Sequence, residues 1–180
     1  MPTVMSHAVA ALAISAPFGR ALSWRARVLG VIAAMAPDAD VIGFRFGIRY
    51  GDMLGHRGLS HSLLFAAALA LLLMLRLLIT ERDANRRRVW LFLFLATASH
   101  GVLDGFTDGG LGVAFFAPFD NTRYFFPVTP IAVSPIGAGF FSMRGLHVLL
   151  NEILWIWIPG LVFGSAMLLL KRHRTPQNES

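Results

Sequence analysis

Histidines and acidic residues occur in this sequence where apolar stretches begin or end. These side chains bind zinc and similar divalent cations when a chain has no cysteine, and this chain has none. An ionisable residue in a membrane segment costs about 2.5–3.5 kcal/mol on insertion scales, so by default it marks a functional site. The candidates are His7, Asp38, Asp40, His56, His61, His100, Asp104 and Glu152.

Three short segments hold these residues at spacings that suit a metal site. His100 and Asp104 are four residues apart, so on a helix they project from one face. Asp38 and Asp40 alternate, and alternate residues of an extended chain point the same way. The segment 56–61, His-Arg-Gly-Leu-Ser-His, places two histidines around a turn that contains glycine. Together the segments predict a metal site built from loops and helix ends.

A serine directly precedes three of the histidines, at positions 6, 60 and 99. Such hydroxyls can hold an imidazole ring in a fixed orientation beside a metal. They also allow a Ser-His-Asp arrangement, with Ser60, Ser62 or Ser99 as the nucleophile. That alternative is weaker, because the sequence has no Gly-x-Ser-x-Gly motif and holds more histidines than a triad uses.

The composition indicates a membrane protein rather than a water-soluble enzyme. Of the 180 residues, 56% are hydrophobic and 14% are charged, whereas soluble domains average about 45–50% and about 25%. The many aromatic residues exclude a disordered chain. The net charge of +6 and the pI near 11.2 would suit nucleic-acid binding. Because the basic residues lie between apolar stretches, they indicate membrane topology instead, and we expect no nucleic-acid partner.

Five apolar stretches predict an all-α integral membrane protein with about four to five transmembrane or half-spanning helices. The last stretch has eighteen residues without a charge, about 27 Å as a helix, close to the roughly 30 Å of a bilayer core. The first two are short enough to be half-helices or a re-entrant pair. Glycines and prolines over 105–150 predict an irregular extracytoplasmic cap. The stretches are 7–19, 28–37, 63–79, 89–104 and 153–170.

The charge distribution predicts an orientation. If the five stretches cross alternately, 11 of the 16 Lys and Arg residues lie on one side, which the positive-inside rule makes cytoplasmic. Every candidate residue then lies at the opposite end of its stretch. We therefore expect a multi-pass protein with its site on the outer face, one domain over 1–174 and a disordered tail over 175–180.

Several motifs resemble those of the YdjM-like proteins of the bacterial cytoplasmic (inner) membrane. They are Pro-Asp-Ala-Asp at 37–40, His-Arg-Gly-Leu-Ser-His-Ser at 56–62, Ser-His-Gly-Val-Leu-Asp at 99–104, and the later Pro-Phe at 118–119, Arg-Tyr-Phe-Phe-Pro at 123–127 and Val-Ser-Pro at 133–135. That family is described as membrane-bound metal-dependent hydrolases and is distantly similar to the zinc-dependent phospholipase C and S1-type nuclease fold. The resemblance runs from about His7 to the last apolar stretch. It implies a hydrolase with a divalent cation, Zn²⁺ before others, in a site of two or three ions.

The resemblance also implies roles for individual residues. The implied metal ligands are His7, Asp38 or Asp40, His61, His100 and Asp104, with His56 and Glu152 as further candidates. In such a site Asp38 or Asp40 bridges ions or acts as the general base, while Arg57 and Arg123 bind a phosphate through bidentate hydrogen bonds. The membrane location favours a lipid or lipid-linked phosphate as substrate, and the sequence leaves the oligomeric state open. The alternative function is a non-enzymatic membrane protein that binds or transports a metal.

Overall fold

A computed structural model describes residues 1–135 and 137–174, and this part of the chain is helical, with isolated bridges but no strand. The predicted all-α class is thus confirmed. The α-helices are α1 Val4–Ser15, α2 Trp24–Met35, α3 Leu63–Leu78, α4 Arg86–Gly105, α5 Met143–Glu152 and α6 Ile158–Arg174. Shorter helices are the 3₁₀ segments η1 Ala16–Ala21, η2 Ala36–Phe46, η3 Leu59–His61 and η4 Gly137–Phe140, and the π-helix η5 Ile153–Trp157. The predicted tail, 175–180, lies outside the described residues.

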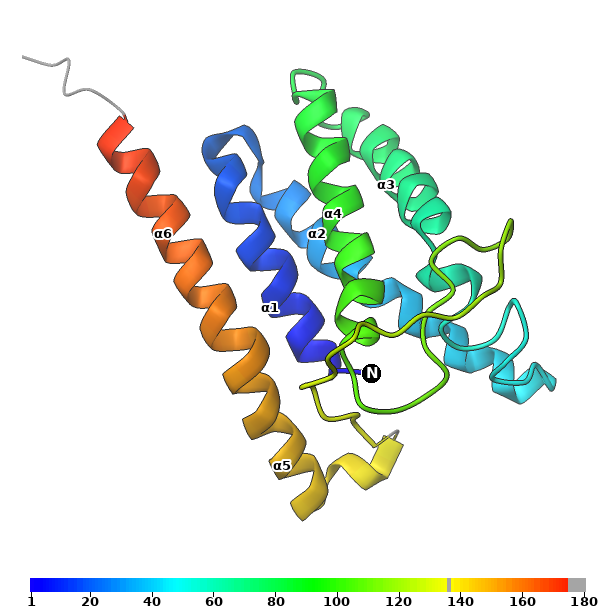
Figure 1. The fold of residues 1–180 in the computed structure, drawn as a ribbon. Helices are drawn as coiled ribbons and strands as arrows, with labels where there is room; N and C mark the ends of the chain where they lie inside the picture. The colour runs from blue at the N-terminus through cyan, green and yellow to red at the C-terminus, as the bar shows by residue number, and fades with distance from the viewer. Residues whose placement is uncertain (136, 175–180) are drawn as a thin grey trace, which may run out of the picture.

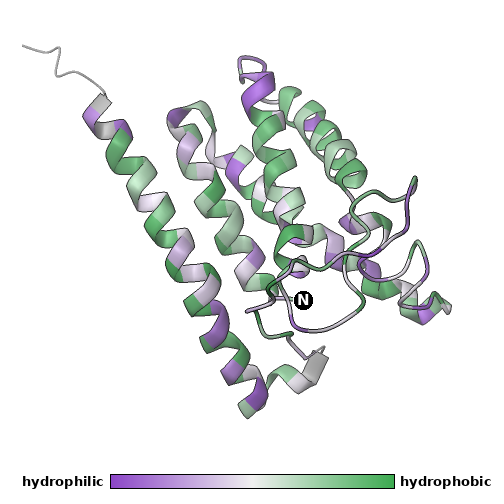
Figure 2. Cartoon of the chain, in the orientation of Figure 1, coloured by the Kyte–Doolittle hydropathy of each residue, from purple (hydrophilic) through white to green (hydrophobic). Residues whose placement is uncertain are grey.

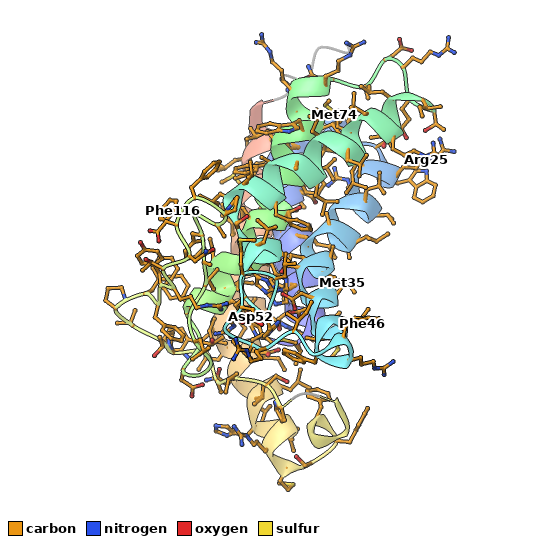
Figure 3. The ribbon with its side chains drawn as sticks, turned by 90° about the vertical axis from the view of Figure 1, so that its right-hand side faces the viewer. Arg25, Met35, Phe46, Asp52, Met74 and Phe116 are labelled. Carbon is orange, nitrogen blue, oxygen red and sulfur yellow. The ribbon has the colours of Figure 1, made fainter. Side chains whose placement is uncertain are left out.

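Helix α4 is central to the bundle, because it packs against α1, α2 and α3, while α6 runs along α1 (Figure 1). The N-terminus and the long loops lie at one end of the bundle, which we name the loop end. In Figure 3, Phe46 and Asp52 lie near that end, whereas Arg25 and Met74 lie near the other. We name the other end the arginine end, because α4 begins there with three arginines.

Small side chains let the central helices approach one another closely. Ala11, Ala26 and Ala96 are fully buried in the core that α1, α2 and α4 share. A β-carbon at Gly30 on α2 would lie 2.3 Å from the ring of Phe92 on α4. Glycine at this position therefore lets the phenyl ring fill the space between the two helices.

Large apolar side chains cover the outside of the molecule. Leu72 and Leu75 on α3 are exposed, as are Leu161 and Val162 on α6. Figure 2 shows apolar residues along both helices and hydrophilic residues mainly in the loops and at helix ends. An apolar surface of this extent indicates contact with lipid or with another protein.

The predicted count of four to five spans is not supported. Among the described residues, one continuous helix, Met143–Lys171, is long and apolar enough to cross a bilayer. Helix α3 is apolar but has only 16 residues, about 24 Å, and α1 and α2 have 12 each. Helix α4 has 20 residues, but three arginines open its first turn and Asp104 lies in its last.

The long helix begins earlier than the sequence predicts. The predicted irregular cap is correct for the loop after α4 but wrong for 143–150, which form most of α5 and continue through η5 into α6. The Ser142 side chain caps α5 by accepting a hydrogen bond from the Gly145 backbone N–H. A β-carbon at Gly145 would lie 1.7 Å from the Phe140 carbonyl oxygen. This glycine therefore permits a close approach and does not break the helix.

Candidate metal centre

Three elements bring histidine and aspartate side chains together near the loop end. Segment η2 follows α2 and carries Asp38, η3 ends with His61, and α4 carries His100 and Asp104 one turn apart. One ligand atom from each of these four buried side chains lies within 4.8 Å of the others. We name these four residues the His/Asp cluster, and it can hold a metal ion.

Local sequence features fix the backbone around the cluster. Pro37 lies in the first turn of η2, where its missing N–H is not needed. The Ser62 hydroxyl accepts a hydrogen bond from the Phe65 N–H at 3.1 Å, so α3 begins directly after His61. A β-carbon at Gly101 would lie 2.8 Å from the His61 carbonyl oxygen. Glycine on α4 therefore allows η3 to lie against this helix.

Imidazole nitrogens face carboxylate oxygens inside the cluster. His100 Nε2 lies 3.2 Å from Asp38 Oδ1, and His61 Nε2 lies 3.3 Å from Asp104 Oδ2. His100 Nδ1 is 2.6 Å from the Ala34 carbonyl oxygen, which can only accept, so Nδ1 carries a proton. In a neutral His100 ring, Nε2 then directs a lone pair at Asp38 Oδ1, which is also an acceptor. A positive charge, either a proton or a metal ion, therefore has to lie between Nε2 and Oδ1.

Several buried polar atoms around the cluster have no hydrogen-bond partner among the described residues. They include both ring nitrogens of His7, Asp38 Oδ2 and Asp104 Oδ1. His61 Nε2 and Asp104 Oδ2 form no hydrogen bond either, although they lie at ion-pair distance from each other and Asp104 Oδ2 also from Arg57. Buried polar groups are normally hydrogen-bonded. Each of these unpartnered atoms is of a type that binds zinc. The donor set therefore fits a divalent cation.

His7 lies beside the cluster rather than inside it. Its ring stacks on His100, with centroids 3.7 Å apart and planes 9° from parallel. The side chain is fully buried. The structure thus brings the predicted ligand from α1 into contact with the ligands from α4, and its unpartnered nitrogens lie within the same buried region.

Asp40 links the cluster to His56. Its Oδ1 lies 2.7 Å from His56 Nδ1, and its Oδ2 lies 3.2 Å from His61 Nδ1 and accepts a hydrogen bond from Ser60 at 2.6 Å. A carboxylate on the far nitrogen of a metal-binding histidine orients its ring. Asp40, His56 and His61 also form a second group that can hold an ion. His61 belongs to both groups, because its Nε2 faces Asp104 and its Nδ1 faces Asp40.

The region carries excess negative charge. With neutral histidines, Asp38, Asp40 and Asp104 beside the buried guanidinium of Arg57 carry a formal charge of −2, which a divalent cation would balance. Burial disfavours a charged His61 ring, but hydrogen bonds with Asp104, Asp38 and Asp40 raise the pKa of His61 to about 10. Burial raises the pKa of Asp40, yet hydrogen bonds from two histidines hold that pKa well below its usual range. The site thus favours added positive charge.

Comparison with known proteins agrees with the motifs around this cluster. The family described as "YdjM inner membrane protein" matches residues 1–175. The chain belongs to the YdjM family. It is 40% identical over 166 residues to inner membrane protein YbcI of Escherichia coli (strain K12), covering 90% of this chain and 94% of YbcI. No solved structure matches. The inner membrane is thus its location, and these names state no activity.

In this YdjM family member, Arg57 faces protein acceptors. Its side chain is fully buried; Nε lies 3.1 Å from Asp104 Oδ2, while the two terminal nitrogens donate to the Gly109 carbonyl at 2.7 Å and to the Thr107 hydroxyl at 2.8 Å. Its backbone φ is 63°, a left-handed conformation that a residue with a side chain rarely adopts. Such strain is often found at functional sites. In this geometry Arg57 contacts Asp104, and protein acceptors occupy both of its terminal nitrogens.

The guanidinium of Arg123 is also occupied by the protein. Its terminal nitrogens donate to the carbonyl oxygens of His56, Tyr50 and Asp52 at 2.9, 3.2 and 3.1 Å. The group also lies 6.0 Å from the centre of the Tyr50 ring. Arg123 therefore holds the loop before η3 in place, a role that the sequence pattern did not predict.

Glu152 is buried away from the cluster. Its carboxyl oxygens accept hydrogen bonds from Thr3 and Ser6 near the N-terminus. Of the three serines that precede a histidine, Ser60 contacts the ring that follows it, whereas Ser6 donates to Glu152 and Ser99 donates to a backbone carbonyl. The predicted place of Glu152 at the end of the last apolar stretch is wrong, because it lies inside the continuous helix Met143–Lys171. Its partners, Thr3 and Ser6, are distant in sequence and were not predicted.

Proposed function

We propose that this YdjM family protein is a membrane-bound metal-dependent hydrolase, with Zn²⁺ or a similar ion held by Asp38, His61, His100 and Asp104. The observation that carries the proposal is the convergence of buried, unpartnered nitrogen and oxygen atoms in the cluster. Burying three carboxylates beside one guanidinium is costly, and the contacts of Asp104 with Arg57 and of Asp38 with His100 offset only part of that cost. A bound cation would supply the remaining positive charge.

Phosphoester hydrolysis is the reaction that this donor set suits best. A divalent cation supplies water activation and charge neutralisation at a phosphoryl group. The chain's own residues support it: Asp40 orients His61, and Arg57 holds Asp104. Because Arg57 and Arg123 already bind protein acceptors, a substrate phosphate would depend on the cation rather than on an arginine clamp. Asp40, His56 and His61 provide ligands for a second ion.

An apolar groove near the cluster supports an amphiphilic substrate. The groove has a volume of about 510 Å³ and is lined by the start of α3, by α4 and by the Phe-rich segment 115–119. It begins at Leu63, two residues after His61, and the Leu63 N–H donates to the Phe115 carbonyl at 3.0 Å. An alkyl chain there would leave a polar headgroup near the loop end. We therefore infer a phospholipid or lipid-linked phosphate as substrate.

Metal analysis and a substrate panel test the proposal. Protein purified in detergent is assayed for bound metal by mass spectrometry and for hydrolysis of soluble nitrophenyl phosphoesters and of phosphatidylglycerol vesicles. We expect at least one equivalent of metal, and hydrolysis that a chelator removes and Zn²⁺ restores. Metal without hydrolysis of any phosphoester would favour the metal-binding or transport alternative. Protein that binds no metal would contradict both.

The position of the cluster favours a hydrolase over an ion path. A transport path needs polar groups at intervals through the bilayer. No ionisable residue occurs over 63–75 or 153–170, and the cluster is confined to one end of the bundle.

We propose that the loop end faces the outside of the cytoplasmic membrane, because the arginine end holds the basic residues expected inside. The chain has no cysteine, so single cysteines report topology cleanly. Asp52 lies at the loop end (Figure 3), and Asn85 caps α4 at the arginine end. We expect an impermeant maleimide to label Asp52→Cys in spheroplasts and Asn85→Cys only after lysis. Labelling of both from one side would contradict a spanning bundle.

A further inference from the structure

A buried carboxyl group joins the long helix to the N-terminal segment. Glu152, the last residue of α5, is fully buried. Its Oε1 accepts a hydrogen bond from the Thr3 N–H at 2.6 Å, and its Oε2 accepts from the Thr3 hydroxyl at 2.5 Å and the Ser6 hydroxyl at 2.6 Å. Residues 3 and 152 are far apart in sequence, so these bonds fix a long-range contact between α5 and α1.

The π-helix η5 adds a second bond to the same hydroxyl. Trp157 Nε1 donates to the Ser6 hydroxyl oxygen at 2.8 Å. In a regular α-helix, residues five apart point about 140° away from each other, because each residue turns about 100°. In a π-helix, hydrogen bonds join residues five apart, so Glu152 and Trp157 both face α1. Segments of this kind occur frequently at functional sites.

The segment that these bonds hold carries His7. Ser6 directly precedes His7, whose ring stacks on His100 of the cluster and whose two nitrogens are buried without partners. Helix α6 packs on the bundle through α1 and η1. A restraint on Ser6 therefore fixes the position of α1 along its axis and its rotation about that axis, and so the placement of the His7 ring on the His100 ring.

We propose that Glu152 is a positioning residue, which anchors α1 to the long helix and so holds His7 at the metal centre. The inference rests on the proposed function. The alternative, that Glu152 itself binds the metal, is disfavoured because three hydrogen bonds occupy its oxygens and it lies in neither group of potential metal ligands. A carboxyl group has about four acceptor sites in all.

The variant Glu152→Gln tests the proposal with little change of shape. Its amide places a donor where one backbone N–H or two hydroxyl donors already point, so at least one hydrogen bond is lost. We expect Glu152→Gln and His7→Ala each to weaken Zn²⁺ binding by about 10–100-fold, the usual effect of losing a group that orients or supports a metal ligand. The double variant should bind no more weakly than His7→Ala alone, because both changes remove the same contribution. Glu81→Gln, at the arginine end, is the matched control.

A metal-independent measurement separates this inference from the proposed function. Hydrogen exchange of the peptide covering residues 1–12 should rise in Glu152→Gln and stay unchanged in Glu81→Gln. Unchanged exchange in Glu152→Gln would overturn the anchoring role, whether or not the protein binds metal. Two results would make Glu152 a ligand instead. One is a double variant whose loss of Zn²⁺ affinity equals the sum of the losses in Glu152→Gln and His7→Ala; the other is a whole metal equivalent lost in Glu152→Gln but not in His7→Ala. Wild-type protein without metal but with the exchange difference would contradict the proposed function alone.

Discussion

Replacing His100 by alanine is expected to abolish bound metal and hydrolysis together. His100 directs Nε2 at Asp38, and its ring carries the stack with His7, so its loss removes one ligand and the support of the neighbouring His7 ring. Asp104→Ala should act alike, because it removes the carboxylate that faces His61 in the cluster. We expect Zn²⁺ affinity to fall by more than about 100-fold, since groups that merely orient ligands are typically worth 10–100-fold. Titration calorimetry and metal analysis of each purified variant measure this loss.

The matched control for the first prediction is His147→Ala. His147 is an exposed histidine on α5, away from the cluster. Its replacement should leave metal content and hydrolysis unchanged. If His100→Ala or Asp104→Ala retains stoichiometric metal, the altered residue does not belong to the ligand set, and the geometry of the cluster has another cause.

Arg57→Met is expected to lower the free energy of unfolding by about 3–5 kcal/mol, the usual cost of breaking a buried ion pair from one side. The guanidinium is fully buried and is shared among Asp104, Thr107 and Gly109. Methionine keeps the length of the side chain but leaves these acceptors without donors. Chemical denaturation in detergent, with and without added Zn²⁺, measures the change, and Zn²⁺ should recover part of the stability by neutralising Asp104.

Arg49→Met provides the comparison for this second prediction. Arg49 is exposed and pairs with Asp52 at 3.5 Å on the surface, so its replacement should change stability by no more than about 0.5 kcal/mol. The phosphate-binding role that the sequence suggested for Arg57 gives a different result. In that case Arg57→Met would leave stability close to wild type and raise the KM for phosphoesters.

The sequence predicted several helices well because their limits depend on local features. The apolar stretch 63–79 is nearly α3, since Ser62 caps its start. The stretch 89–104 lies within α4, which begins after the capping residue Asn85. The pairing of His100 with Asp104 followed from helical spacing alone. Local periodicity and capping therefore account for the correctly predicted part of the fold.

The predicted direction of the two aspartates was wrong for a local reason. An extended Asp-x-Asp would point both side chains the same way, but η2 is a 3₁₀-helix, in which residues two apart point in different directions. Asp38 therefore faces His100, while Asp40 faces His56. The two carboxylates thus have different closest histidines, and they approach the two opposite ring nitrogens of His61.

Long-range partners could not be read from the sequence. Arg123 binds backbone carbonyls, groups that every residue has, so no residue type marks them. Glu152 meets donors 146 and 149 positions away. Charged residues were therefore recognised as unusual, but their roles depend on packing between distant segments.

The length of the continuous helix also determines how deep the metal centre lies. From Glu152 to Lys171 the chain rises nineteen residues, about 29 Å, which matches the roughly 30 Å hydrocarbon thickness. If the helix spans as proposed, Lys171 would lie at one surface of the hydrocarbon layer and Glu152 at the other. Because Glu152 binds the segment next to His7, the cluster would then lie level with the glycerol and phosphate groups of one leaflet. A lipid phosphoester would reach it by diffusing sideways in the membrane, without leaving the bilayer.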